Sequence, residues 1–494
     1  MVGTIARSLL IVVVVGAVAL VASPSPSRAQ LWPATCGYYG PFGFDTYEAL
    51  NHVADYGRAI NYAVEGKAVP EPYNIWTGER IDVSYQGVEK GPRNNRSGPL
   101  KTERIPPSVY KSIAWIEANW NNAAGSVPYG GVGQVLTSFD CGYGLGQVTT
   151  GMANTNGNAS AHQAIVGTHF LFNVAEGVRI LADKWNSAPR YRPIAGLGNP
   201  AHLEDWYYAI WSYNGFAFSN HPLNPERSIW RGEVYHCYDP SSPNYIVDGD
   251  GDVVFGYGAY TYPERVYGCM RYPPKRDDVR MYGATTFSMP NFSIPAVAQA
   301  FDPEAFKSCQ AIGFSTGCPD MDYPTTIPAY NVVPHADPTP KVSGTVPFLG
   351  APSLAFSGKT NVSITVSNSG SIFGTETVTL SNAGTYIAPF RIRTSADWIV
   401  VHHPGESSRR LQGSIAIGND VSVVTSVGTQ AGYKSTLIIT VDQAKMPASH
   451  VEGTVWIEAL YGAGRVFKIN VAATRGAYNL PIKAIVPAIS ADKD

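Results

Sequence analysis

The sequence predicts a multidomain α + β protein, in which a mainly α-helical domain is followed by an all-β sandwich. Apolar residues recur at helical spacing from residue 105 to about 270, and they alternate with polar residues between 351 and 475. A segment dense in proline separates the two patterns. The chain has 494 residues, more than one hydrophobic core usually spans, so two or more domains are expected.

The composition limits the classes of partner. The chain is 44% hydrophobic and 15% charged, which is typical of folded protein and excludes disorder throughout. Its formal net charge is −2 and no block of lysine and arginine occurs, so nucleic acid is not an expected partner. No cysteine and histidine cluster has the spacing of a zinc site, and we expect neither a metal nor another cofactor.

The first residues have the pattern of an export signal. Arg7 precedes the apolar stretch Leu9–Ala22, and the small residues Ser27 and Ala29 flank a cleavage point. A membrane anchor is the alternative, but this stretch is shorter than the roughly 20 residues that a spanning helix needs. We therefore expect residues 1–29 to be a signal peptide, and the mature protein to be secreted into the extracytoplasmic space with no membrane segment.

All the cysteines lie before residue 320. An even number of cysteines in an exported protein indicates disulfides, although the sequence does not select their pairing. The six residues are Cys36, Cys141, Cys237, Cys269, Cys309 and Cys318.

Residues 30–100 are rich in tyrosine and glycine around one predicted helix, Thr46–Val64, and we expect them to pack on the helical domain as an N-terminal extension. The helical domain spans 101–275 and opens with Pro106-Pro107, where a missing N–H costs nothing. Three amphipathic series follow a helical period. They are Val109, Ile113, Ile116 and Trp120; Phe170, Val174, Val178, Leu181 and Trp185; and Leu203, Trp206, Ile210 and Tyr213.

Residues 276–350, which include Cys309 and Cys318, are predicted to form a Pro-rich linker and a stiff spacer, because proline fixes φ and lacks an N–H. Residues 351–475 follow with the period-two pattern of a β-sandwich, and 476–494 form a C-terminal tail. The alternating runs are Val362–Val366, Val378–Leu380, Leu437–Val441, Val455–Ile457 and Phe467–Val471.

The stretch IAWIEANW, Ile113–Trp120, sets a single acid in an apolar helix. At about 100° per residue, Glu117 lies beside Ile113 and Tyr110 at the border of the apolar stripe. Burial there would raise the pKa of the carboxyl, as a general acid requires near neutral pH. A lone glutamate at the edge of a stripe is more often solvated or salt-bridged, so this residue alone does not identify a site.

Two further segments add to this pattern. In GYGLGQ, Gly142–Gln147, three glycines let the backbone approach a ligand closely, and the amide of Gln147 can both donate and accept. WSYNG, Trp211–Gly215, ends a predicted helix, which would place Tyr213 and Asn214 at the rim of a cleft.

The order of these motifs resembles that of the soluble lytic transglycosylase (SLT) domain and, more distantly, goose-type lysozyme. The matching segments are Glu117-Ala118, Gly144-Leu145-Gly146-Gln147 and Ser212–Gly215. TYPERVYGCM, Thr261–Met270, is similar to the family's closing Tyr-Val segment and offers Tyr262. The resemblance covers about 165 residues and implies a lysozyme-like catalytic domain within 101–275.

The chain departs from the family pattern at three points. Gly146 replaces the family's methionine and so removes an apolar contact to the sugar, and Phe216 stands where a small residue is usual. About eight extra residues lie between Glu117 and Gly144. These differences bear on substrate preference more than on reaction type.

The resemblance implies cleavage of the β-1,4 bond between N-acetylmuramic acid and N-acetylglucosamine in peptidoglycan glycan strands, the expected partner of a monomeric enzyme. Glu117 would be the catalytic residue: it protonates the leaving oxygen and then assists the muramic acid C6 hydroxyl to close a 1,6-anhydro ring. The substrate-binding residues would be Gln147, Tyr213, Asn214, Tyr262 and Gly144.

Two alternatives stay open. A hydrolytic muramidase or chitinase-like glycosidase of the same fold normally uses a second carboxylate. Goose-type lysozymes carry an acid just after the glutamine, whereas this chain has Val148-Thr149; Asp140 could serve, but its position is more typical of a loop or capping residue. The other alternative is a non-catalytic cell-wall-binding protein.

DGDGD, Asp248–Asp252, alternates acids with glycine as a calcium loop does. An EF-hand needs glycine and glutamate at its sixth and twelfth positions, where this chain has Val253 and Ala259, so a solvated acidic turn is the better interpretation.

Three segments of the sandwich, DWIVV, LIITVD and GTVWIEA, resemble bacterial immunoglobulin-like modules related to BACON domains, which are attached to many surface glycosidases. The resemblance implies an Ig-like sandwich over 351–475 that acts as a spacer or wall-docking module. Trp398 could stack on a sugar, but a strand tryptophan in such a sandwich more often belongs to the core.

Overall fold

The computed structural model describes residues 42–476 apart from several internal segments. These segments are 93–94, 139, 153–157, 192–195, 216–219, 224–236, 238–259, 277–278, 290–294, 296–333, 406–409, 418–433 and 464–465. The predicted signal peptide, the DGDGD motif, Phe216 and the tail beyond Gly476 lie outside the described residues, as do Cys36, Cys309 and Cys318.

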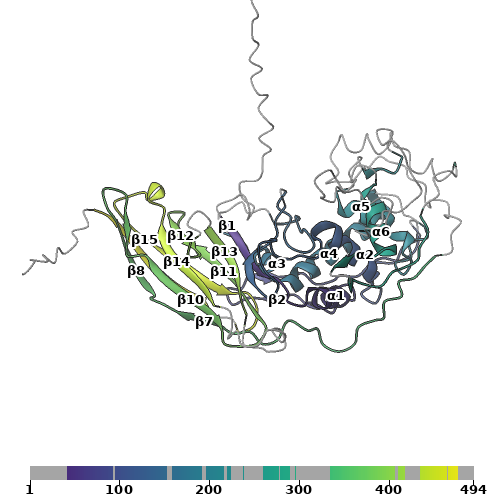
Figure 1. The fold of residues 1–494 in the computed structure, drawn as a ribbon, viewed down its shortest axis with the longest axis horizontal. Helices are drawn as coiled ribbons and strands as arrows, with labels where there is room; N and C mark the ends of the chain where they lie inside the picture. Colours follow the sequence, from purple (N-terminus) through teal and green to yellow (C-terminus); the bar gives the residue numbers. More distant parts are fainter. Residues whose placement is uncertain are drawn as a thin grey trace, which may run out of the picture.

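Helices gather in one half of the molecule (Figure 1). They are α1 (His52–Ala63), α2 (Pro107–Ala118), α3 (Ala161–Thr168), α4 (Phe170–Tyr191), α5 (Tyr207–Tyr213) and α6 (Tyr262–Arg271), with a 3₁₀ turn, η1 (Glu204–Trp206), before α5. The start of α2 at Pro107 and the α4 series agree with the sequence prediction. The predicted helix Thr46–Val64 is shorter than expected, because its first residues belong to a strand.

Two packed sheets form the other half. The larger sheet has the order β4-β1-β13-β11-β15-β16-β8-β9 and the smaller one has the order β12-β14-β10-β7. The larger sheet contains β4 (Val132–Gln134), β1 (Phe42–Tyr47), β13 (Arg410–Ile417), β11 (Ile387–Thr394), β15 (His450–Ala459), β16 (Val466–Arg475), β8 (Asn361–Val366) and β9 (Ile372–Phe373). The smaller contains β12 (Ile399–His402), β14 (Ser435–Val441), β10 (Glu376–Asn382) and β7 (Leu354–Ser357).

The core of this half contains the apolar side chains of the predicted strands, and the five predicted alternating runs all lie in strands. In β8, for example, Val362, Ile364 and Val366 are buried while the residues between them are not. Trp398 is 3% exposed within the same core, which confirms its expected structural place.

The predicted fold class, a mainly α-helical lysozyme-like domain followed by an all-β Ig-like sandwich, is wrong. Helix accounts for 25% and strand for 28% of the structure, which is a mixed α/β protein. Strand β1, inside the predicted N-terminal extension, pairs in parallel with β13 and antiparallel with β4 from the predicted helical domain. The large sheet therefore crosses both expected domain boundaries, because an edge strand has unpaired backbone groups that a distant segment of the chain can satisfy.

Two short hairpins add further strand to the helical half. They are β2 (Tyr73–Asn74) with β3 (Arg80–Ile81), and β5 (Lys275–Arg276) with β6 (Val279–Arg280).

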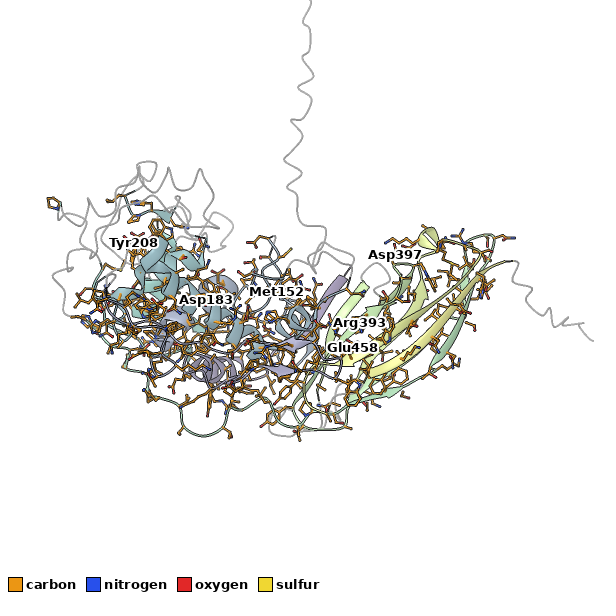
Figure 2. The ribbon with its side chains drawn as sticks, turned by 180° about the vertical axis from the view of Figure 1, so that it is seen from behind. Met152, Asp183, Tyr208, Arg393, Asp397 and Glu458 are labelled. Atoms are coloured by element: carbon orange, nitrogen blue, oxygen red, sulfur yellow. A yellow bond between two sulfur atoms is a disulfide. The ribbon has the colours of Figure 1, made fainter. Side chains whose placement is uncertain are left out.

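A buried ion-pair network joins the two halves. Arg391 of β11, only 2% exposed, contacts Glu458 of β15 at 2.5 Å and Glu79 of the helical half at 2.8 Å. Glu79 also accepts a hydrogen bond of 2.6 Å from the backbone N–H of Ala161, the first residue of α3. Figure 2 shows Glu458 beside Arg393, which contributes the second guanidinium of the network at 2.5 Å. Charge-assisted bonds of this kind have strong directional requirements, so the sheet and α3 are held in one orientation.

The described part of the predicted linker packs along the helical half before it enters the sandwich (Figure 1). His335 contacts Glu204 at 2.7 Å, and the hydroxyl of Tyr62 donates to the carbonyl of Ser343 at 2.8 Å. Phe348 is 4% exposed and packs edge-on against Phe170. Residues 334–350 of the predicted stiff spacer therefore pack against the helical half.

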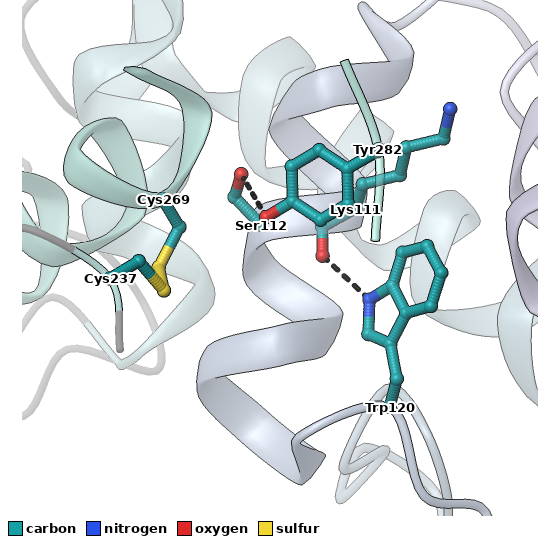
Figure 3. Close-up of a disulfide and its surroundings, with 6 residues drawn as sticks. All are labelled: Lys111, Ser112, Trp120, Cys237, Cys269 and Tyr282. Carbon is teal, nitrogen blue, oxygen red and sulfur yellow. Dashed lines mark hydrogen bonds between the residues drawn. A yellow bond between two sulfur atoms is a disulfide. The ribbon is translucent and has the colours of Figure 1, made fainter. Parts of the chain in front are cut away.

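Cys237 and Cys269 form a disulfide, which ties α6 to a residue from the preceding connection (Figure 3). Cys141 is buried. Among the described helices, no single one is long and apolar enough to cross a bilayer; α3 and the first part of α4 pass such a test only together, with a bend of 110° between them.

Candidate active site

Glu117 is the residue before last of helix α2. Asn119, the residue that caps the C-terminus of this helix, adopts the left-handed conformation with φ of 49°. The other faces of α2 are held by packing (Figure 3). The indole N–H of Trp120 donates to the carbonyl of Lys111 at 2.9 Å, and the hydroxyls of Ser112 and Tyr282 lie 3.0 Å apart. Lys111 and Ser112 are about 120–140° from Glu117 around the helix, so these contacts fix the helix without covering the carboxyl.

Glu117 lines a pocket of about 430 Å³. Three of the predicted substrate-binding residues, Gln147, Tyr213 and Asn214, line the same pocket. Its full lining is Glu117, Ser138, Asp140, Gln147, Val148, Thr149, Thr150, Ile180, Lys184, Tyr213, Asn214 and Gly215. Residues from four separate parts of the chain thus meet around one carboxyl group.

Tyr262, the first residue of α6, donates a hydrogen bond from its phenol to Glu117 Oε1. Burial raises the pKa of Glu117 from 4.5 to about 7, and the hydrogen bond from Tyr262 and the charge of Arg265 partly oppose this rise. Burial, and then the charge of Glu117, raises the pKa of Tyr262 well above 10, so the phenol stays a donor near neutral pH. Glu117 is consequently an acid that can both give and take a proton near pH 7.

The Gly-rich turn is clamped by two buried asparagines that the sequence analysis did not select. The backbone N–H of Leu145 donates to Asn122 Oδ1 at 3.1 Å, and that of Gly146 donates to Asn173 Oδ1 at 2.9 Å. Gly144 has φ of 64°, and a Cβ there would lie 2.6 Å from Asn122 Oδ1. Gly144 is not in the lining of the pocket. Its lack of a side chain instead lets the turn pack directly against Asn122.

Gln147 follows this turn in the left-handed conformation, with φ of 43°. Its amide nitrogen donates to the carbonyl of Gly144 at 2.8 Å, which fixes the side chain at the pocket wall. Such a conformation is uncommon for a residue with a side chain and persists only where the surrounding structure enforces it.

Gly146 stands where buried tyrosines leave no room for a side chain. A Cβ at this position would lie 2.5 Å from the hydroxyl of Tyr110 and 3.3 Å from that of Tyr213. The Tyr213 hydroxyl donates to the carbonyl of Gly146 at 2.7 Å. The absence of the methionine expected from the family pattern thus reflects packing against these two rings.

A short polar relay links Asn214 to the start of α6. Asn214 Oδ1 accepts from Asn220 Nδ2 at 2.8 Å, and Asn220 Oδ1 accepts from the backbone N–H of Tyr262 at 3.0 Å. Thr261 and Glu264 form a capping box at the same helix terminus. Tyr262 is thereby held at both its backbone and its hydroxyl. Asn220 has no sequence motif that marks it.

Glu48, which the sequence analysis also missed, supports the pocket from the N-terminal extension. Its carboxylate accepts from the Tyr56 hydroxyl at 2.6 Å and from the backbone N–H groups of Asn122 and Ala123 at 2.8 and 2.6 Å. The extension therefore fixes the loop that carries one of the two clamping asparagines.

Asp140 lies on the turn before the Gly-rich segment and is exposed at the pocket. It accepts a hydrogen bond from the Ser138 hydroxyl, as a loop residue does, and its negative charge contributes to the raised pKa of Glu117. The structure thus gives Asp140 a loop contact together with a place in the same pocket as Glu117.

The joint between the two halves carries a more open depression of about 590 Å³, lined by Tyr73, Asn74, Ile75, Trp76, Ala459, Leu460, Tyr461 and Gly462. This lining contains no carboxylate, histidine or lysine, so it offers no acid–base chemistry. Across the described residues, no group of three histidine, cysteine, aspartate or glutamate side chains could hold a metal ion. The pocket around Glu117 is therefore the better candidate for a reaction site.

Neither a protein-family model nor a curated protein matches the chain. Solved structures similar to part of it include a GH5 xyloglucanase from Bacteroides ovatus in complex with an XXXG heptasaccharide, a FixG-related protein from Vibrio parahaemolyticus, and the periplasmic chaperone SfaE. Each match covers 26% of this chain, with identities of 17%, 7% and 11% and TM-scores of 0.15, 0.16 and 0.16. The matches span 20%, 98% and 60% of those chains. At such TM-scores the likeness carries no argument about this protein.

Proposed function

We propose that this protein is a peptidoglycan lytic transglycosylase that acts outside the cytoplasm. The observation that carries the proposal is the half-buried carboxyl of Glu117, which has a pKa raised to about 7 and shares one pocket with Gln147, Tyr213 and Asn214. The order of these residues in the chain, which resembles that of the SLT domain, supplies the reaction type. The disulfide Cys237–Cys269 is in keeping with an oxidising, extracytoplasmic compartment.

The proposed reaction uses one group twice. The protonated carboxyl of Glu117 gives its proton to the bridging oxygen as the bond from muramic acid C1 to that oxygen breaks. The resulting carboxylate accepts the proton of the C6 hydroxyl as the O6–C1 bond forms. The products are a free 4-hydroxyl and a 1,6-anhydro ring, and no water is consumed. A pKa near the working pH suits both proton transfers.

The remaining site residues have separate roles in this proposal. Tyr262 holds the Glu117 carboxyl in position through its hydroxyl. Gln147 and Asn214 line the pocket. Their amides can donate hydrogen bonds to, and accept them from, the N-acetyl and hydroxyl groups of the sugar. Tyr213 supports the Gly-rich turn through its bond to Gly146.

Digestion of purified peptidoglycan tests the proposal. Mass spectrometry of the products should show anhydro ends, which weigh one water less than the reducing ends left by a hydrolase. Glu117→Gln should lower the rate at least about 100-fold, in line with the usual contribution of a general acid. Glu452→Gln, a change to a glutamate whose side chain is 77% exposed in the sandwich, is the matched control and should keep full activity. Equal lysis by the Glu117→Gln variant and the parent would refute catalysis by this residue.

Hydrolysis by the same pocket is the second candidate, and Asp140 is the observation that favours it. A second carboxylate beside the acid could activate water, as in ordinary glycosidases. Hydrolysis predicts products with reducing ends and a strong loss of activity in Asp140→Asn. The transglycosylase proposal predicts anhydro products from both the parent and Asp140→Asn.

A further inference from the structure

The open depression at the joint is a second concave region, and its lining shares no residue with the pocket around Glu117. Residues 73–76 of this lining belong to β2 and the turn after it, and residues 459–462 belong to the end of β15 and the segment that follows. Figure 1 places β2 between the helices and the sandwich, so both halves of the molecule form the depression. Ligand sites often lie between domains, and a volume of about 590 Å³ is within their usual range of about 300–1,000 Å³.

Trp76 lines this depression and is 73% exposed, which makes it the most exposed large apolar side chain among the described residues. Its backbone is nevertheless held in a hydrogen-bonded turn. The N–H of Gly78 donates to the carbonyl of Ile75 at 2.9 Å, and the N–H of Ile75 donates to the carbonyl of Glu79 at 2.9 Å. Glu79 itself belongs to the ion-pair network of the joint. The exposed indole is therefore carried by a fixed turn.

Aromatic contacts hold the two sides of the depression together. Tyr73 packs edge-on against Tyr461, with ring centroids 5.7 Å apart. Both rings also pack edge-on against Phe172 of α4, at 6.2 and 5.8 Å. The Tyr73 hydroxyl donates to the carbonyl of Leu460 at 3.0 Å. A ligand would therefore meet a preformed surface, which lowers the entropic cost of binding.

The side chains of the lining match an uncharged ligand that has an apolar face and polar edges. The indole of Trp76 offers an apolar surface, and the exposed amide of Asn74 can both donate and accept hydrogen bonds. The lining contains no charged side chain, so it offers no partner for the phosphates of a nucleic acid or for an ionised peptide. A pyranose ring fits this combination, because its C–H groups form an apolar face and its hydroxyl or acetamido groups lie at its edge.

We propose that the joint depression is a glycan-binding site, in which an uncharged pyranose residue stacks on the indole of Trp76 and forms hydrogen bonds with Asn74. This site goes beyond the proposed function, because it takes no part in bond cleavage and does not depend on Glu117. A protein bound to a glycan at the joint stays close to the polymer while its other pocket engages and releases a strand. The effective concentration of strand at that pocket rises accordingly.

Quenching of tryptophan fluorescence by iodide tests the stacking, in full-length protein that carries Glu117→Gln so that the ligand stays intact. Iodide reaches an exposed indole, so adding Trp76→Phe should remove part of the quenchable emission. Saturating tetra-N-acetylchitotetraose should protect that part of the emission from iodide. Protection by cellotetraose as well assigns the site to pyranose chains in general, whereas protection by the first sugar alone assigns it to N-acetylated glycans.

Two outcomes of this measurement overturn the proposal. One is protection by neither sugar, and an uncharged Ala-Val hexapeptide that protects in their place would identify a peptide groove. The other is equal protection in the protein with Trp76→Phe, which would place the bound sugar at a different tryptophan.

Cosedimentation with insoluble chitin and with purified peptidoglycan measures the contribution to affinity in the same background. Trp76→Ala should weaken binding about tenfold, and Asn74→Ala about threefold. Leu197→Ala is the matched control, because it removes an apolar side chain that is 60% exposed and lies outside both linings, and it should change binding less than twofold. Since Trp76 is exposed, Trp76→Ala should keep the unfolding temperature of the protein, which separates lost binding from lost folding.

The glycan site and the proposed function can fail separately. Unchanged binding of both polymers by Trp76→Ala overturns the glycan site, while anhydro products from the parent would still support the transglycosylase. Lost binding by Trp76→Ala in a protein whose parent releases no anhydro products supports the glycan site and refutes the transglycosylase.

Discussion

Replacing Glu117 by glutamine should stabilise the protein above about pH 4.5, and most strongly at neutral to alkaline pH. The folded protein holds this carboxyl with a pKa of about 7, compared with 4.5 when it is solvated. Between these values the folded state binds more protons than the unfolded state, so the free energy of unfolding falls as pH rises through this range. The difference corresponds to at most about 3 kcal/mol above pH 7. Glutamine is neutral, so the folded protein does not have to bury an ionised group at this position. The carbonyl oxygen of glutamine can still accept the hydrogen bond from Tyr262.

Scanning calorimetry of the parent and Glu117→Gln at several pH values measures this difference. At pH 4 the two transition temperatures should agree closely. At pH 8 the variant should unfold about 3 °C higher, the shift expected for about 3 kcal/mol in a chain of this size. The gain should appear between pH 4.5 and 7, the interval between the two pKa values of this carboxyl.

Glu48→Gln is the matched control. Burial also raises the pKa of Glu48, but its two oxygens accept three hydrogen bonds, from the Tyr56 hydroxyl and two backbone N–H groups. The NH₂ group of glutamine would face a donor in either orientation, so this variant should lose about 1–3 kcal/mol. A Glu117→Gln protein that is no more stable than the parent at pH 8, or one whose gain is the same at pH 4, would refute burial as the origin of the raised pKa.

Three further predictions concern the pocket and the joint. Tyr262→Phe removes a hydrogen bond that lowers the pKa of the proposed acid, so the alkaline limb of the pH profile of kcat/KM should move up by about one pH unit, while Tyr282→Phe leaves it in place. Gly146→Ala forces a Cβ to within 2.5 Å of a buried tyrosine hydroxyl and should lower stability to urea by about 1–3 kcal/mol. Arg391→Met breaks the buried network and should cost about 3 kcal/mol in thermal unfolding, and the double change with Glu458→Met should recover part of this.

Local sequence patterns correctly predicted features that lie within a single helix or strand, such as where a helix begins or ends. Pro106-Pro107 predicted the start of α2, and Asn214-Gly215 predicted the end of α5. The alternation in Val362–Val366 predicted β8. Each of these features depends on backbone preferences or on a periodic apolar face, both of which are properties of adjacent residues.

Features that depend on distant partners could not be predicted in this way. Asn173 interrupts the apolar run Phe170–Ala175 and is a buried polar residue that needs partners, but two of its three side-chain partners lie 27 and 30 residues earlier. Strand β1, whose last two residues fall in the predicted helix Thr46–Val64, has no local signal, because its partner β13 follows more than 350 residues later. Asn220 carries no local signal for its contacts with Asn214 and Tyr262.

The sequence by itself determined that a helix with one acid near its end precedes a Gly-rich turn and a Tyr-Asn-Gly helix stop. Only the tertiary structure decided that this acid is half-buried in a pocket, that the hydroxyl of Tyr262 donates a hydrogen bond to it, and that Asp140 and Lys184 share its pocket. Covalent neighbours fix where a carboxyl stands on its helix. Its pKa depends on how much water and charge surround it, and those surroundings come from residues 138–150, 180–184, 213–215 and 262, which only folding brings together.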